Sequence, residues 1–156
     1  MPPDRVPAAR AGLLPDSYRY WAFISYSHAD AAWARWLHHA LETYPIPAVL
    51  VGRSAPLGTV PPRIKPVFRD RDELPAASEL GPQLEAALRD SVTLVVLCSP
   101  HSAKSRWVNE EILFFKRLGR GARVFPLIVD GVPGDRGGRE CFPPGVRTVV
   151  NADGTV

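Results

Sequence analysis

The sequence has few cysteines, no long apolar run and no phosphate-binding glycine motif. Two cysteines, Cys98 and Cys141, are too few for a disulfide scaffold, and the four histidines show no metal-ligand spacing with them. No run of 18 apolar residues occurs, so we expect no membrane segment within this chain. The glycines form neither G-x-G-x-x-G nor G-K-[ST], which excludes the common phosphate loops. We therefore expect a cytoplasmic protein without a metal site.

Lysine is scarce as well. The 19 basic residues include only 3 Lys, hence 16 Arg, and they face 16 acidic residues for a net charge of +3. The basic residues are interleaved with acidic ones, whereas nucleic-acid binders usually cluster their cations, so we expect no nucleic-acid partner. A length of 156 residues with 46% hydrophobic residues is typical of one packed domain.

Strand-like and helix-like segments alternate along the chain. β-Branched and aromatic runs predict strands over 20–26, 64–68, 92–98, 124–129 and 146–150. Amphipathic spacing predicts helices over 29–44, 78–90 and 106–118. This order predicts an α/β fold, an open and mostly parallel sheet with helices on both faces. The predicted parts are a loose leader over 1–19, one domain over 20–150 and a polar tail over 151–156, with ligands bound beyond the carboxyl ends of the strands.

One acidic residue does not fit its surroundings. With about 100° per residue in the helix predicted over 106–118, Glu111 falls on the apolar face, between Phe115 and Leu118. A carboxylate there is costly unless it is paired or reaches a cleft. Trp107 stands one turn earlier on the same face. Glu111 is therefore either a structural carboxylate or a functional one flanked by an aromatic ring.

The sequence gives weaker support for a nucleophilic serine, a receiver-type acid cluster or a reactive cysteine. Ser25, Ser27 and Ser99 lie at strand ends near His28 and His101, but no G-x-S-x-G elbow marks a nucleophile. Asp30, Asp70 and Asp72 resemble the acid cluster of a receiver domain. A receiver domain also has an Asp at the end of its third strand and a Lys near its fifth, whereas Ser99 and Asp130 end these strands here, with no Lys nearby. Cys98 is interpreted as a small buried hydrophobe.

Five segments share a pattern with a known family, in the family's order: 22–27 (AFISYS), 67–70 (VFRD), 95–100 (VVLCSP), 105–112 (SRWVNEEI) and 125–130 (FPLIVD). Together they resemble a Toll/interleukin-1 receptor (TIR) domain of bacterial type. The resemblance implies a flavodoxin-like sheet of five parallel strands, here without the final helix of the family fold.

The resemblance also implies a function. Many members cleave the nicotinamide–ribose bond of NAD with a glutamate in the pattern W-x-x-x-E, which Trp107 and Glu111 match. NAD is then the substrate, no cofactor is needed, and the product is linear or cyclic ADP-ribose. Members of this kind act as signalling or defence effectors that self-associate, whereas others only dock partners, and this non-catalytic role is the alternative. The resemblance implies substrate contacts at Tyr26, Ser27, Asp30, Arg69, Ala77, Leu80, Ser99 and Trp107.

The chain departs from the family pattern in three places. The loop after the second strand has Ala76-Ala77-Ser78 where many members have a glycine, and the proline-rich segment 45–63 is long. No amphipathic helix follows residue 150. We therefore expect a truncated domain, with an apolar patch beside 124–129 and 146–150 that a following helix would cover.

Overall fold

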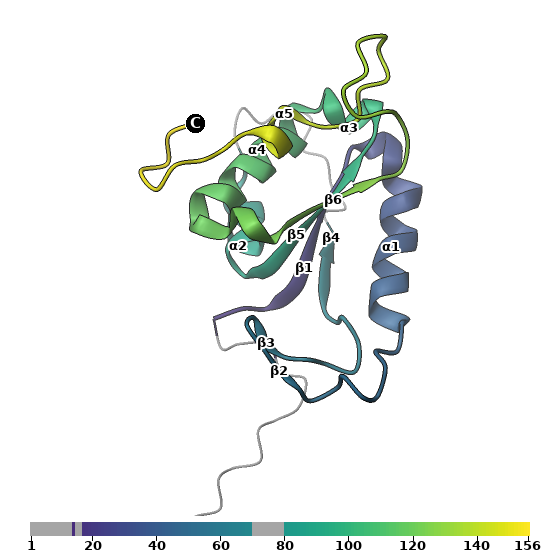
Figure 1. Cartoon of the computed structure of the whole chain (residues 1–156), viewed down its shortest axis with the longest axis vertical. Helices are drawn as coiled ribbons and strands as arrows, with labels where there is room; N and C mark the ends of the chain where they lie inside the picture. The colour runs from purple at the N-terminus through teal and green to yellow at the C-terminus, as the bar shows by residue number, and fades with distance from the viewer. Residues whose placement is uncertain (1–13, 15–16, 70–79) are drawn as a thin grey trace, which may run out of the picture.

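Four parallel strands form the central sheet in the computed structural model, which describes residues 14, 17–69 and 80–156 (Figure 1). The sheet order is β4 (Val67–Arg69), β1 (Tyr20–Ser25), β5 (Ser91–Cys98) and β6 (Val124–Ile128). Both long strands, β1 and β5, lie in the middle, as their continuous apolar runs predict. The α/β class and the parallel sheet are confirmed.

The prediction of a fifth strand over 146–150 is wrong for the described residues. The chain instead forms the short helix α5 (Pro144–Arg147) and then continues without regular structure. Pro144 occupies the first helical position, where its fixed φ favours a helical turn. The Lys116 ammonium then donates to the carbonyl oxygens of Val146 (3.1 Å) and Thr148 (2.7 Å), which a strand would pair with a neighbour.

Helices cover the two faces of the sheet unequally. α1 (Ala31–Thr43), preceded by the 3-10 turn η1 (His28–Asp30), lies on one side, and α2 (Pro82–Arg89) and α4 (Arg106–Phe115) lie on the other (Figure 1). Under α4 the α4-side core contains Phe23, Ala87, Leu88, Leu94, Val96, Cys98, Val108, Ile112, Phe115 and Cys141. The smaller α1-side core contains Ala22, Ile24, Ala34, Leu37, Val67 and Leu97. Alternate residues of β1 and β5 therefore serve opposite faces.

Local signals set the helix ends. α2 begins at Pro82 after the N-cap Gly81, later than predicted, and the proposed cap Ser78 lies outside the described residues. The N-cap Ser105 starts α4 and accepts a hydrogen bond from the Val108 amide at 3.3 Å. α4 continues into a π-helical turn, η2 (Lys116–Arg120), where Gly119 has φ of 77°. A 3-10 turn, η3 (Gly121–Arg123), leads into β6. No helix of the described part is long and apolar enough to cross a membrane.

The proline-rich segment 45–63 contains a small element that periodicity did not reveal. Two-residue strands, β2 (Ser54–Ala55) and β3 (Gly58–Thr59), pair antiparallel below the main sheet (Figure 1). Strands this short carry no measurable alternation, so the sequence predicts only an extended surface segment there.

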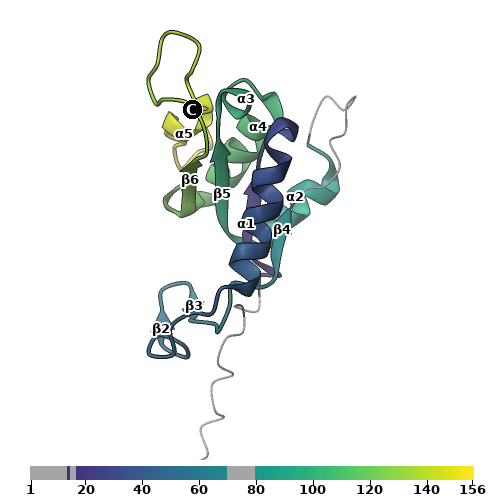
Figure 2. The ribbon, with the colours of Figure 1, turned by 90° about the vertical axis from the view of Figure 1, so that its right-hand side faces the viewer.

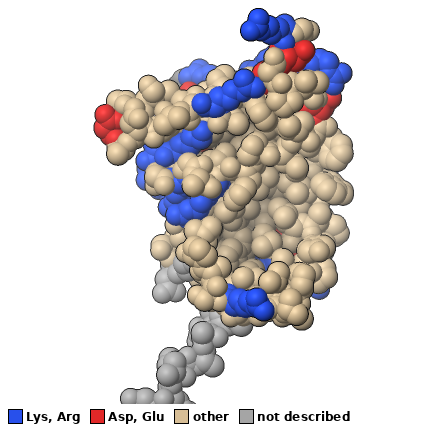
Figure 3. Space-filling view, viewed as in Figure 1, with Lys and Arg blue, Asp and Glu red and all other residues tan. Residues whose placement is uncertain are grey.

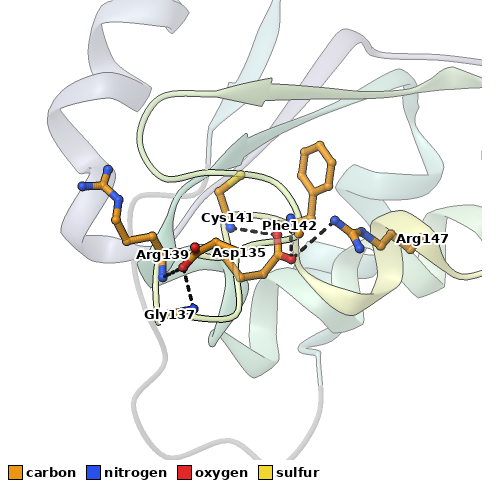
Figure 4. Close-up of polar contacts among 8 residues, drawn as sticks. Asp135, Gly137, Arg139, Cys141, Phe142 and Arg147 are labelled. Carbon is orange, nitrogen blue, oxygen red and sulfur yellow. Dashed lines mark hydrogen bonds and ion pairs between the residues drawn. The ribbon is translucent and has the colours of Figure 1, made fainter.

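Two carboxylates organise the loop that follows β6. Asp135 accepts hydrogen bonds from the amides of Gly137 (2.9 Å) and Arg139 (2.8 Å), as Figure 4 shows. Glu140 accepts from the amides of Phe142 and Cys141, both at 2.9 Å, and the donation from Phe142 is the main cause that lowers its pKa. The predicted loop over 130–145 is thus an ordered structure held by its own side chains, as far as the start of α5.

The α1 face of the sheet is left open beside its edge strand. Phe125 (52% exposed) and Leu127 (38% exposed) are in register with Val95 and Leu97, so they point to the α1 side. Figure 2 shows β5 to one side of α1 and β6 farther from this helix, which leaves Phe125 and Leu127 exposed. The predicted apolar exposure at 124–129 is confirmed, whereas one patch that also includes 146–150 remains a prediction. Cover by a following helix remains a prediction.

The orientation of α1 adds to this open surface. His38 Nδ1 accepts a hydrogen bond from Arg69 Nε (3.2 Å), and Glu42 accepts one from the Val67 amide (2.9 Å), so the polar side of α1 faces β4. The opposite side presents Trp33 and Trp36, which are 48% and 58% exposed. Figure 3 shows a broad surface without charged side chains across this side of the molecule.

We expect the two sides of the sheet to differ in their contribution to stability. Leu94→Ala, in the buried centre of β5, should lower the free energy of unfolding by about 2–5 kcal/mol, because it leaves a cavity in the α4-side core. Leu127→Ala on the open edge strand should change it by less than about 1 kcal/mol. Urea denaturation followed by circular dichroism measures both. Equal losses would show that β6 is packed as tightly as β5.

Candidate active site

The carboxyl ends of β1 and β5 meet at one edge of the sheet. Ser25 is the last residue of β1 and pairs in register with Val96, and β5 ends two residues later at Cys98. The loops that follow these strands lead into η1 and α3 (Pro100–Ala103). In open parallel sheets this edge is where ligands bind, and it is where the sequence predicts the site.

Glu111 is buried at this edge. It lies on α4, is 6% exposed, and is flanked by the buried Val108 and Ile112. The apolar position that the helical wheel predicts for it is therefore confirmed. The Ser25 hydroxyl, at the end of the central strand, donates a hydrogen bond to Glu111 Oε2. A hydroxyl donor of this kind offsets part of the cost of burying a carboxylate.

A second buried carboxylate belongs to Asp30 in η1. It is 6% exposed, and the Ser99 hydroxyl donates to its Oδ2 at 2.5 Å. Ser99 Oγ also accepts hydrogen bonds from the amides of His101 (3.2 Å) and Ser102 (3.1 Å), which makes it the N-cap of α3. The structure thus brings Asp30 and Ser99 together, and their bond ties the loop after β1 to the loop after β5.

Trp107 lies one turn before Glu111 on α4. Its side chain is half-buried, and the Arg106 guanidinium carbon is 5.9 Å from its ring centroid. A ring that is only partly covered can stack on a planar ligand. Trp107 thus lies on the same helix as Glu111, one turn earlier, and a ligand flanked by the ring and the carboxylate remains a prediction.

The remaining predicted contacts are spread over the two faces of the sheet. Tyr26 and Ser27 follow β1 and are half-buried. Arg69 is in register with Ile24, so it points to the α1 side, where it donates to His38, whereas Ser25 points to the α4 side. Leu80 packs against the α4-side core at the start of α2, and Ala77 lies outside the described residues.

Ser25 is the contact that sequence reasoning missed as a partner of Glu111. Side chains alternate along a strand, so Ser25 shares a face with Phe23, and Phe23 belongs to the core under α4. That alternation, combined with the inward position of Glu111, was the available signal. It locates the face but not the partner, because a separation of 86 positions in the chain gives no register.

Cys98 is unsuited to covalent chemistry although it ends β5 beside Ser99. Its side chain is 0% exposed, and burial raises the pKa of its thiol to about 12. The thiolate is the nucleophilic form of cysteine, so Cys98 stays inert at neutral pH. The interpretation of Cys98 as a buried hydrophobe is confirmed.

The described residues contain no group of three or more His, Cys, Asp or Glu that could hold a metal ion.

Comparisons with known proteins identify the family of the chain. The family model described as "TIR domain" matches residues 22–153. The chain is 36% identical over 114 residues to a protein from Actinoplanes sp. named NAD(+) hydrolase ApTIR, a match that covers 72% of this chain and 14% of that protein. The chain therefore spans about a seventh of the length of this relative. Its fold is also similar to the TIR domains of the activated Roq1 resistosome, with a TM-score of 0.44 and 20% identity over 70% of this chain and 56% of that one.

We expect both thiols to resist modification in the folded protein. At pH 8 a rise in pKa from 9.0 to about 12 lowers the thiolate fraction of Cys98 by roughly three orders of magnitude. Burial also raises the pKa of the Cys141 thiol. Reaction with a chromogenic disulfide reagent should therefore be more than about 100-fold slower than in guanidinium chloride. Rapid labelling of Cys98 in the folded protein, located by mass spectrometry, would contradict this assignment.

Proposed function

Because the chain belongs to the TIR domain family, we propose that it cleaves NAD+ at the nicotinamide–ribose bond with Glu111 as its catalytic carboxylate. The observation that carries the proposal is the burial of Glu111 at the ligand-binding edge of the sheet, on the helix that also presents Trp107. The similarity to a relative named as an NAD(+) hydrolase supports the same assignment.

The proposed reaction needs one acidic residue and no metal. Nicotinamide leaves with the electron pair of the C–N bond, so the cationic ring becomes a neutral molecule and no general acid is required. Positive charge then develops on the ribose as an oxocarbenium-like species. A carboxylate fixed beside the ribose stabilises that charge. Water adds to the ribose carbon and releases a proton, giving ADP-ribose, and attack from within the same molecule gives a cyclic product.

The surroundings of Glu111 fit this role. The half-buried Trp107 ring offers a flat surface for the nicotinamide or the ribose, one turn before the carboxylate. The bond between Ser99 and Asp30 fixes two of the loops that border the same edge. Preorganised groups of this kind avoid reorganisation at the moment of reaction.

Self-association is part of the proposal. The side chains of Trp33, Trp36 and Phe125 are about half exposed. Large exposed apolar side chains of this kind are typical of protein–protein interfaces. We propose that contacts between copies of the domain raise its activity, as suits a cytoplasmic signalling or defence effector that acts on cellular NAD+. A non-catalytic docking module remains the second candidate, and the same exposed aromatic residues favour it. The buried carboxylate separates the two, because docking alone does not require it.

Glu111→Gln should lower the rate of nicotinamide release from NAD+ by at least about 100-fold, because it removes the charge while keeping the shape of the side chain. The matched control is Glu110→Gln on the next position of α4, where the side chain is only half-buried and should tolerate the change. Chromatography of the reaction mixture measures nicotinamide, and circular dichroism checks the fold. Equal rates for Glu111→Gln and the parent would make Glu111 a structural residue.

The specific activity should depend on protein concentration. If contacts between copies complete or order the active site, activity per mole should rise as the protein is concentrated or crowded. Nicotinamide release measured over a hundredfold range of concentration, with light scattering at each point, tests this. A rate strictly proportional to concentration, from a protein that stays monomeric, would remove self-association from the proposal.

A further inference from the structure

A buried long-range hydrogen bond joins the end of β1 to α4. Ser25 is 1% exposed at the end of β1, Glu111 is 6% exposed on α4, and the hydroxyl donates to Glu111 Oε2. The two residues are 86 positions apart in the chain, so only the folded sheet and its covering helix bring them together.

Both ends of this contact are held by packed structure. β1 pairs with β4 on one side and with β5 on the other, and its Phe23 and Ile24 are fully buried. On the helix, Val108 and Ile112 on either side of Glu111 are 1% and 0% exposed. Neither backbone can shift without disturbing the core. The hydroxyl therefore gives Glu111 Oε2 a fixed reference point, which restricts rotation of the carboxylate.

We propose that Ser25 is a positioning residue for Glu111, whose hydroxyl sets the orientation of the carboxylate that faces the substrate. This inference rests on the proposed function. Ser25 is itself almost completely covered, so it acts through Glu111 rather than through contact with NAD+. Catalytic groups must be held within a fraction of an ångström, and a displacement of about 1 Å costs around 100-fold in rate.

A positioning role and a purely structural role predict different kinetics. Removing the hydroxyl should lower kcat about 10- to 100-fold, because the carboxylate loses its orientation. It should leave KM within about twofold, because the surfaces that bind NAD+ remain. A structural role would lower the melting temperature and the amount of active protein but leave kcat per folded molecule unchanged.

The chain provides a matched control for burial and hydrogen bonding. Ser91 is 0% exposed at the opposite end of the sheet, and its hydroxyl donates to the Ala87 carbonyl oxygen at 2.7 Å. Ser91→Ala removes the same atoms from an equally buried site, far along β5 from the carboxyl ends of the strands. It should affect stability as Ser25→Ala does, with kcat close to the parent value.

The experiment compares the 156-residue parent, Glu111→Gln, Ser25→Ala, Ser25→Thr and Ser91→Ala in steady-state NAD+ cleavage. We expect Ser25→Ala to lose kcat with its KM retained, and Ser25→Thr, which keeps a hydroxyl, to recover most of it. Parent-like kcat for Ser25→Ala, in a protein where Glu111→Gln is inactive, would overturn the inference and leave the proposed function standing. A folded parent that releases no nicotinamide at any concentration would overturn both.

A second substitution decides the question if Ser25→Ala does not fold. Ser25→Cys keeps the size of the side chain but is a weak donor, so kcat should fall while the fold, checked by circular dichroism, is retained. Parent-like kcat for a folded Ser25→Cys would overturn the inference, because the strength of the hydrogen bond would then have no influence on the reaction.

Discussion

The pairing of β1 with β5 is the constraint on which the rest of the structure depends. Its register, from Tyr20 opposite Ser91 to Ser25 opposite Val96, decides which side chains of both strands serve which face. With this register Ile24 points to α1, and Phe23 and Ser25 point to α4. A slip of one residue would exchange the two sets and would separate Ser25 from Glu111. The same pairing that builds the core therefore builds the site.

Much of the fold could be predicted from local patterns. The long apolar run of β5 and the spacing of apolar residues in α4 are strong signals, and both elements appear within a few residues of the expected bounds. The strand expected at 146–150 is replaced by α5 because Pro144 and the Lys116 ammonium outweigh the propensity of valine and threonine for strands. Periodicity over five residues cannot weigh such tertiary contacts.

In the site, too, local features could be predicted from the sequence and long-range contacts could not. The position of Glu111 on an apolar helix face is a local property, so a helical wheel is enough to identify it. Its bond to Ser25 and the bond between Asp30 and Ser99 each join segments far apart in the chain. The resemblance to the family implies that Asp30 and Ser99 contact the substrate. In the structure the Ser99 hydroxyl donates a hydrogen bond to Asp30. No local pattern in the sequence predicts this bond, because the two residues are 69 positions apart.

The open edge of the sheet is also shaped by Pro126 in the middle of β6. The Val129 amide donates to the Cys98 carbonyl oxygen, and since main-chain groups alternate along a strand, Pro126 faces away from β5. At the place where an incoming strand would seek a donor, the chain therefore has a ring carbon instead of an N–H. Growth of the sheet from one molecule to the next is interrupted there, which protects an otherwise apolar edge from fibril-like stacking. The proposed contacts between copies would then use the side-chain faces, because the backbone of this edge strand lacks a donor at Pro126.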